Sequence, residues 1–477
     1  AFKNQEFRYK RLNIFKNNVT LQLRGDFMLQ RKAYEHLVKW KNTSDKKALL
    51  ITGARQIGKT YIIRKFAEEN YSNFIEINFI TNPDAAKIFN GDLNAETILI
   101  NLTAYTQKPL VKGDTLIFFD EIQECPSART AIKFLVDDGQ FDYIESGSLL
   151  GVRYKEVKSY PVGYEENYRM YPLDFEEFAT ANGIQPQTIE YLKKCHDNKE
   201  TITEAVHQSM LKLFQYYIIV GGMPAVVQKF VDTKDIGEVL KIQKDILDLY
   251  RQDISKYSDN NKEKIKSIFD LIPAQLNDRN RRFTLSDIKN SARMLRYETS
   301  FNWLADAGVA LPCYNITEPV LPLELNLQNN LFKLFLCDTG LLCAASMGNI
   351  QFDILSGDLS VNMGSILENV FAQELVSNGF LLRYFNKKNI GEIDFIVQKG
   401  KSAVPIEIKS GNDYTKHKAL DNLIAKQSWN INSGIVFCKG NLEIENGITY
   451  YPWYMSMFFK QETLPEHLKV NVDIVNI

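Results

Sequence analysis

The sequence predicts an α/β fold with two α/β regions and a helical region between them. In the first 180 residues, short apolar runs typical of buried strands alternate with helical segments, and this alternation predicts a parallel sheet flanked by helices. Residues 185–300 have helical periodicity and no convincing strand. From about residue 364, one helical segment is followed by short runs rich in β-branched and aromatic residues, which predicts a second α/β region.

The length and composition are those of a folded protein with several domains. A chain of 477 residues corresponds to about three domains at roughly 150 residues per domain. Hydrophobic residues make up 45% and charged residues 24%, which leaves no room for a large disordered fraction. The 57 basic and 58 acidic side chains give a net charge of −1, so any contact with nucleic acid is expected to use a local patch.

The cysteine pattern and the apolar segments predict a cytoplasmic protein. The six cysteines include no C-x-x-C pair, and no histidine lies at zinc-finger spacing, so a structural zinc site is not expected. The segment 1–18 mixes aromatic and basic residues instead of forming an apolar signal-peptide core. The longest apolar stretch, 216–227, is shorter than the ~18 residues of a membrane span. We therefore expect a reducing cytosol and no membrane contact.

The first region combines a basic start with alternating strands and helices. Residues 1–27 carry six basic and two acidic side chains and are interpreted either as a basic arm or as a leader without function. We then expect helices at 29–40, 61–70 and 93–105. Strands are expected at 48–52, 73–79, 115–121 and 141–148. The aromatic segment 159–178 is expected to add a strand and a helix start, and the sheet to end near residue 180.

The middle region is expected to be helical, with clear periodicity at 202–220 and 236–258. Residues 283–308 contain two short helical patterns joined by a tight turn, and the strand-like run 309–316 follows. This order predicts a winged helix-turn-helix module. Six basic residues could give it a DNA-binding surface, whereas a packing module between domains is the other interpretation. They are Arg279, Arg281, Arg282, Lys289, Arg293 and Arg296.

The last third begins with a predicted helix at 365–379, for which Gly379 is a suitable C-terminal cap. Short strands are expected after it, because each run is β-branched or aromatic and is bounded by Gly, Asn or Lys. They lie at 381–385, 392–398, 403–409 and 433–438. This pattern predicts a C-terminal α/β domain.

The strongest functional pattern is GARQIGKT at 53–60, which is a P-loop placed between an apolar strand and a helix. Its glycines let consecutive backbone N–H groups face phosphate oxygens at a helix N-terminus. Lys59 is expected to bridge the β- and γ-phosphates of ATP, and the Thr60 hydroxyl to bind Mg²⁺. The residues expected to contact the nucleotide are Gly53, Ala54, Arg55, Gln56, Ile57, Gly58, Lys59, Thr60 and Tyr61.

A second pattern, LIFFDE at 116–121, is a buried strand that ends in two acids, as in a Walker B motif. We expect Asp120 to hold Mg²⁺ and Glu121 to act as general base on the attacking water. Ser146 and Ser148, at the end of the next strand, are candidate sensors of the γ-phosphate, although Ser-Gly-Ser also suits a turn. Candidates for a charge-neutralising arginine are Arg55, Arg129, Arg153 and Arg169, with a structural contact the preferred interpretation of Arg169.

A third constellation lies in the last region and consists of Glu368, Asp394, Glu407 and Lys409. Residues 407 and 409 lie on one face of a strand because strand side chains repeat every two residues. If the strand of Asp394 is its hairpin neighbour, three carboxylates and one lysine converge. Asp394 and Glu407 would then bind Mg²⁺ and activate water for attack on a phosphodiester. The same residues could also form the polar face of an ordinary hairpin.

Together with YPLDFEEF (171–178) and LFKLFLCDTGLL (331–342), these motifs resemble a family of prokaryotic AAA-type ATP-binding proteins over residues 28–430. The resemblance implies a C-terminal domain similar to the PD-(D/E)XK nucleases, although Ile393 replaces the proline expected before Asp394. After the basic arm read from the local charge, it implies four segments: a P-loop ATPase domain, a helical segment, a winged-helix-like module and a nuclease-like domain. The expected ranges of the arm and of these four segments are 1–27, 28–182, 183–270, 271–345 and 346–477.

Two functions follow from this resemblance. The first is a Mg²⁺-dependent ATPase that couples its nucleotide state to a nuclease-like domain acting on nucleic acid. The alternative is a nucleotide-dependent switch or scaffold for a protein partner, with a catalytically silent nuclease-like domain. Expected ligands are ATP or ADP and Mg²⁺, and expected macromolecular partners are DNA or another nucleic acid, a protein, or further copies of this chain.

Overall fold

The computed structural model describes residues 29–147, 160–257, 261–278, 282–283, 297–346 and 363–462. The basic segment 1–27, Ser148, Arg153 and most of the predicted helix-turn-helix, including Lys289, Arg293 and Arg296, lie outside these residues. Within the described part, the order of elements confirms the predicted α/β fold class. In the same part, no helix combines the length and the apolar character needed to cross a membrane.

The first sheet has five parallel strands in the order β2-β3-β4-β1-β5. Their bounds are Ala48–Thr52 (β1), Asn73–Asn78 (β2), Thr115–Asp120 (β3), Asp142–Gly147 (β4) and Glu165–Arg169 (β5). Because all five strands run in the same direction, their carboxyl ends meet at one edge of the sheet. The loop after β1 and the two acids at the end of β3, Asp120 and Glu121, lie at this edge.

Helices cover both faces of this sheet. Leu49 and Ile51 on one face pack in a core with α2 (Lys32–Lys41) and α3 (Lys59–Asn70). Leu50 on the other face packs in a separate core with α4 (Ala95–Thr106) and α5 (Pro126–Asp138). Buried strands with apolar residues on both faces explain the continuous runs ALLIT and TLIFFD in the sequence.

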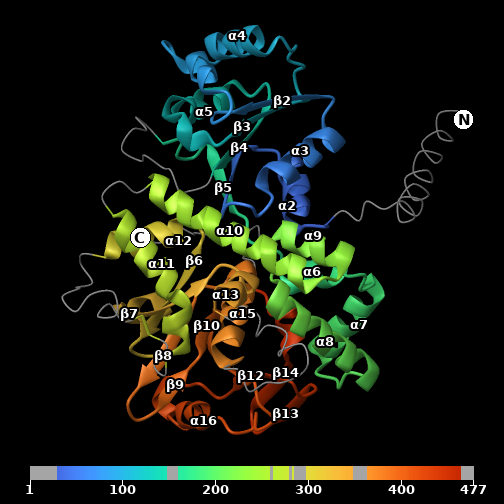
Figure 1. Cartoon of the computed structure of the whole chain (residues 1–477), viewed down its shortest axis with the longest axis vertical. Helices are drawn as coiled ribbons and strands as arrows, with labels where there is room; N and C mark the ends of the chain where they lie inside the picture. Colours follow the sequence, from blue (N-terminus) through green and yellow to red (C-terminus); the bar gives the residue numbers. More distant parts are fainter. Residues whose placement is uncertain are drawn as a thin grey trace, which may run out of the picture.

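A layer of helices follows the first sheet. Their bounds are Phe175–Ala181 (α6), Pro186–Asn198 (α7), Glu204–Val220 (α8), Pro224–Thr233 (α9), Ile236–Tyr257 (α10), Lys262–Asn277 (α11) and Glu298–Asp306 (α12). Figure 1 shows α10 running across the middle of the molecule, between the first sheet and the C-terminal elements. The predicted all-helical character of the middle region is confirmed for the residues described there.

Two further sheets form the C-terminal part. The four-stranded sheet has the order β7-β6-β8-β9, and the five-stranded sheet has the order β10-β11-β12-β14-β13. The strands of the first are β6 (Ala310–Ile316), β7 (Leu327–Leu336), β8 (Arg383–Lys387) and β9 (Gly391–Ile393). Those of the second are β10 (Phe395–Lys399), β11 (Ser402–Ile408), β12 (Gly434–Cys438), β13 (Glu443–Glu445) and β14 (Ile448–Pro452).

The four-stranded sheet joins both sides of the boundary predicted at residue 346. Strand β6, which the sequence assigned to a winged-helix-like module, pairs in parallel with β8 of the last region. Helices α13 (Thr339–Ser346), α15 (Met363–Ser377) and α16 (Lys418–Ile424) pack around these sheets. One buried core continues from the first sheet through the helical layer to α15 and the strands beyond it. The described parts of the chain are therefore tightly connected.

Candidate functional site

The loop between β1 and α3 has the geometry of a phosphate-binding loop. Gly53 has φ 140° and Gly58 has φ 88°, and both values lie in the region that favours glycine. A Cβ atom on Gly53 would lie 2.3 Å from the carbonyl oxygen of Met170, so a side chain has no room there. The chain then enters α3 at Lys59, which directs the first N–H groups of the helix toward the loop.

Lys59 is buried at the inner side of this loop. Its Nζ atom donates hydrogen bonds to the carbonyl oxygens of Gly53 (3.0 Å) and Ala54 (2.9 Å). Burial lowers the pKa of Lys59 to about 8, although the nearby carboxylates of Glu121 and Asp120 oppose this shift. The two acids of the predicted Walker B motif thus act electrostatically on the ammonium group.

Asp120 is the centre of a hydrogen-bond network at the carboxyl edge of the sheet. Its two carboxylate oxygens each lie 3.2 Å from the Thr60 hydroxyl, and Oδ2 accepts a hydrogen bond of 2.8 Å from Asn78. The Ser146 hydroxyl also contacts Oδ1. A hydroxyl beside a carboxylate is an all-oxygen donor set that suits Mg²⁺. The residues present therefore fit the predicted metal, which would be held by Thr60 and Asp120.

Glu121 follows Asp120 and turns away from the strand direction. Its φ of 55° lies in the left-handed region, where the chain leaves β3 for a short 3₁₀ turn. The Gln123 side chain donates a hydrogen bond of 2.5 Å to Glu121 Oε2 and so orients the carboxylate. Glu121 directly follows Asp120, whose carboxylate contacts the Thr60 hydroxyl at the end of the phosphate-binding loop.

The structure places the candidate arginines in different settings. Arg129 is buried and pairs with Glu165 at 2.9 Å, and Arg169 donates to the Ala305 carbonyl oxygen at 2.6 Å. Arg55, in the phosphate-binding loop, pairs with Asp253 of α10 at 2.8 Å. Arg153 lies outside the described residues. Of the arginines that the structure describes, Arg55 is the candidate that belongs to the loop itself.

Three of the four residues in the predicted nuclease-like set lie together. Asp394 connects β9 to β10, and its Oδ2 accepts a hydrogen bond of 2.8 Å from the backbone N–H of Ile408. Lys409 Nζ lies 3.5 Å from Glu407 Oε2. Burial raises the pKa of Glu407 to about 8, and the neighbouring Asp394 carboxylate adds to this shift. The predicted hairpin between the two segments is confirmed, because β10 and β11 are antiparallel neighbours.

Glu368, the fourth residue, has a different partner. Its Oε2 lies 3.0 Å from the ammonium of Lys333, a fully buried lysine that also pairs with Glu392 at 2.7 Å. Among the residues that the structure describes, no three His, Cys, Asp or Glu side chains are grouped closely enough to hold a metal ion. The expected convergence of the three carboxylates is therefore not found among the described residues, where the Glu368 carboxylate pairs with the buried Lys333 instead.

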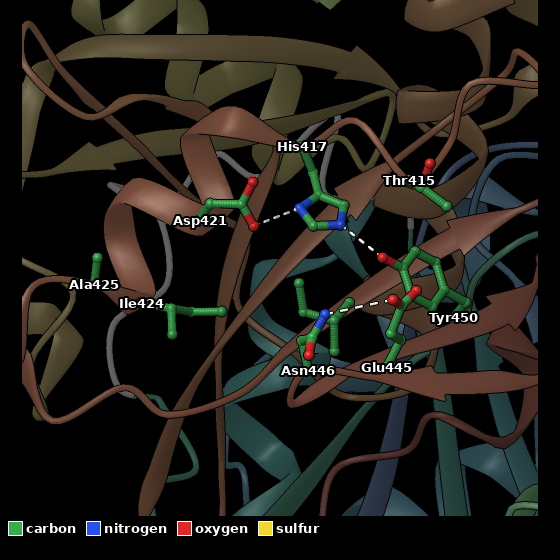
Figure 2. A pocket seen from close by; sticks show the side chains of 9 residues that line it. Thr415, His417, Asp421, Ile424, Ala425, Glu445, Asn446 and Tyr450 are labelled. Atoms are coloured by element: carbon green, nitrogen blue, oxygen red, sulfur yellow. Dashed lines mark hydrogen bonds and ion pairs between the residues drawn. The ribbon is translucent and has the colours of Figure 1, made fainter.

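Two of the histidines that the structure describes, His207 and His417, have hydrogen-bond partners within the protein. His417 lies on the wall of a pocket of about 560 Å³ beside α16 and β14 (Figure 2). Its Nδ1 atom pairs with Asp421 at 2.8 Å, and its Nε2 atom lies 2.7 Å from the Tyr450 hydroxyl. In the core, His207 Nδ1 similarly lies 2.9 Å from the Tyr454 hydroxyl.

Sequence reasoning missed several residues that shape the nucleotide site. Asn78 ends β2 beside Asp120, and its place at the carboxyl end of a neighbouring strand could have identified it. Arg31 donates to the Ile57 carbonyl oxygen at 3.0 Å, and the Tyr250 hydroxyl donates to the Arg55 carbonyl oxygen at 3.0 Å. No sequence pattern links Arg31 or Tyr250 to the loop, because each contact depends on tertiary packing.

Three family models match successive parts of the chain. The model described as "AAA domain" matches residues 45–179, which include the phosphate-binding loop and the two acids at the end of β3. Two models described as domains of unknown function, DUF8612 and DUF4143, match residues 211–351 and 363–455. No curated protein matches the sequence.

Several solved structures are distantly similar. The Walker-type ATPase PABY2304 of Pyrococcus abyssi has 12% identity and a TM-score of 0.40, covering 67% of this chain and 96% of that chain. ORC1 of Aeropyrum pernix in complex with DNA has 12% identity and a TM-score of 0.26, covering 69% and 91% respectively. The Holliday junction branch migration motor RuvB of Thermotoga maritima has 12% identity and a TM-score of 0.27, covering 59% and 89%.

These similarities are too low to support an argument about function. The assignment depends instead on the parallel sheet, the loop after β1 and the family match. Residues 45–179 therefore have the fold, the phosphate-binding loop and the family match of an AAA-type P-loop ATPase domain.

Proposed function

We propose that this chain is a Mg²⁺-dependent ATPase that binds ATP at residues 53–61. The observation that carries this proposal is the approach of the Thr60 hydroxyl to both oxygens of Asp120, beside the buried ammonium of Lys59. These groups supply an oxygen donor pair for a metal and a positive charge for phosphates at the same edge of the sheet. Mg²⁺, when bound, would neutralise charge on the phosphates.

The roles of the protein groups follow from their positions. Backbone N–H groups at the start of α3 bind phosphate oxygens, and Lys59 balances their charge. Glu121, held by Gln123, accepts the proton of the attacking water. Asn78 and Ser146 fix the orientation of Asp120, so that its carboxylate does not have to reorganise when the nucleotide binds.

Replacing Thr60 with alanine tests the proposed metal site. We expect the variant to hydrolyse ATP at least about tenfold more slowly at low Mg²⁺ and to recover partly at high Mg²⁺, because it loses one oxygen ligand. Phosphate release measured over a Mg²⁺ titration gives the hydrolysis rate at low Mg²⁺ and the rate recovered at high Mg²⁺. Thr233→Ala, an exposed threonine in the last turn of α9, is the matched control. An unchanged Mg²⁺ dependence in Thr60→Ala would contradict the assignment of the ligand.

For the C-terminal region, we propose a nuclease-like site at Asp394, Glu407 and Lys409 that acts on nucleic acid in a manner coupled to the nucleotide state. The proximity of Lys409 to Glu407 and the placement of Asp394 on the neighbouring chain segment support this proposal. The alternative is a catalytically silent domain that serves as a switch or scaffold for a protein partner. The ion pair between Glu368 and the buried Lys333 favours this alternative.

A cleavage assay distinguishes these two candidates. If the site is active, the wild-type protein cuts plasmid or single-stranded DNA in the presence of Mg²⁺ or Mn²⁺, and Asp394→Ala and Lys409→Ala each reduce the rate at least about 100-fold. The exposed ion pair of Asp413 and Lys416 provides the controls Asp413→Ala and Lys416→Ala. Absence of cleavage by the wild-type protein with and without ATP would leave the switch or scaffold as the function of this region.

A further inference from the structure

Segments outside the AAA-matching residues contact the phosphate-binding loop. Two side chains of α10, one turn apart, reach Arg55: Asp253 accepts a hydrogen bond of 2.8 Å from the guanidinium, and the Tyr250 hydroxyl donates one of 3.0 Å to the main-chain carbonyl. Gly308, after α12, is packed so closely that a Cβ atom on it would lie 2.9 Å from the nitrogen of Ala54. The helical layer is therefore in direct contact with the loop.

The Arg55 guanidinium has two anionic groups to choose between, the Asp253 carboxylate and the phosphates of bound ATP. The Asp253 side chain is 9% exposed and the Arg55 side chain 27% exposed, so their ion pair is largely shielded from water. Arg55 is itself a residue of the phosphate-binding loop and directly follows Ala54, whose carbonyl oxygen accepts a hydrogen bond from Lys59 Nζ. ATP would bring several negative charges to a guanidinium that already has a carboxylate partner.

We propose that Asp253 is a positioning residue of the nucleotide site, which competes with the ATP phosphates for the guanidinium of Arg55 and so reports nucleotide occupancy to α10. This inference rests on the proposed ATPase function and adds a residue, 198 positions away from Arg55, that regulates the loop. ATP draws Arg55 toward the phosphates, and the ion pair that ties α10 to the loop is exchanged for a phosphate contact.

Packing contacts connect α10 to the C-terminal region, so the loss of the Arg55–Asp253 ion pair can affect that region. Helix α10 packs on α13, and α13 packs on α15, the helix that carries Glu368. The buried Gln243 of α10 also donates hydrogen bonds to the carbonyl oxygens of Ile219 (2.8 Å) and Val220 (3.1 Å) at the end of α8, and α8 packs on α13 as well. A change in the last turns of α10 therefore acts on elements that are already in contact with the C-terminal sheets.

A double-mutant cycle on the full chain tests the competition. We expect Asp253→Asn to bind a fluorescent ATP analogue roughly threefold to tenfold more tightly than the wild-type protein, because the variant lacks the carboxylate that competes with the phosphates for Arg55. In an Arg55→Ala background, the same change is expected to have no effect. Asp245→Asn, an exposed carboxylate on the same helix, is the control, and thermal unfolding verifies that each variant is folded.

Amide hydrogen exchange along α10 tests independently whether ATP loosens the contact between α10 and the phosphate-binding loop. We expect ATP to speed exchange in the last two turns of α10 in the wild-type protein and to have no such effect in Arg55→Ala. Equal affinities of the wild-type protein and Asp253→Asn, an effect of Asp253→Asn that persists without Arg55, or an unchanged α10 would each overturn the proposal. If the wild-type protein and Lys59→Ala bind the analogue equally weakly, the ATPase function itself fails.

Discussion

Glu121→Gln is expected to lower the rate of ATP hydrolysis about 100- to 10,000-fold while leaving ATP bound, because general-base catalysis contributes about that much to such reactions. The amide keeps the size of the side chain and can still accept a hydrogen bond from Gln123, whose Nε2 lies 2.5 Å from Glu121 Oε2. It cannot take a proton from water. Single-turnover phosphate release and retention of ATP on the protein measure the two effects separately.

The neighbouring Glu124 offers a matched control for this substitution. It is exposed and lies in the same short turn, three residues after the proposed base. Glu124→Gln should hydrolyse ATP at the wild-type rate. A Glu121→Gln variant that releases phosphate as fast as the wild-type protein would show that another group activates the water.

Lys59→Ala is expected to weaken ATP binding about 10- to 100-fold, which corresponds to the loss of one or more charge-assisted hydrogen bonds. The ammonium is buried, donates hydrogen bonds to two loop carbonyl oxygens and is stabilised electrostatically by Asp120 and Glu121. Without it, Asp120 and Glu121 would face the phosphates with no protein cation between them. The dissociation constant of a fluorescent ATP analogue, measured with and without Mg²⁺, gives the size of the effect.

Lys65→Ala is the corresponding control on the same helix. Its ammonium lies over the ring of Tyr34, on the side of α3 that packs against α2. Removing this charge should leave ATP affinity unchanged. If both variants bind ATP as tightly as the wild-type protein, the loop is not the nucleotide site.

The first sheet and the phosphate-binding loop could be predicted because both depend on patterns within short segments of the sequence. The run ALLIT is apolar on both faces, as expected for a strand covered by helices on both sides, and the glycines after it meet the demands of a tight loop. The acids of LIFFDE come directly after a buried strand, and parallel strands bring them to the same edge as the loop. Spacing along the chain was enough to predict that Thr60 and Asp120 approach each other.

In the C-terminal set, the proximity of Asp394 and Glu407 could be predicted from the sequence, whereas the partner of Glu368 could not. The hairpin between β10 and β11 placed Asp394 near Glu407, as the alternation of strand residues predicts. Glu368 lies on a helix, and its environment depends on which strand packs beneath that helix. That strand is β7, which brings the buried Lys333 to the carboxylate. A lysine within LFKLFL carries no sign of this partner.

The sequence by itself determined the α/β fold class, the phosphate-binding loop and the identities of Lys59, Thr60 and Asp120, because these features depend on patterns within short segments. Only the tertiary structure decided that β6 and β8 share one sheet, that Glu368 pairs with Lys333, and that α10 holds Arg55 through Asp253. Each of these contacts joins residues dozens to hundreds of positions apart. Such contacts form because burial in the folded chain brings oppositely charged or apolar groups together, and no periodicity along the sequence predicts which groups meet.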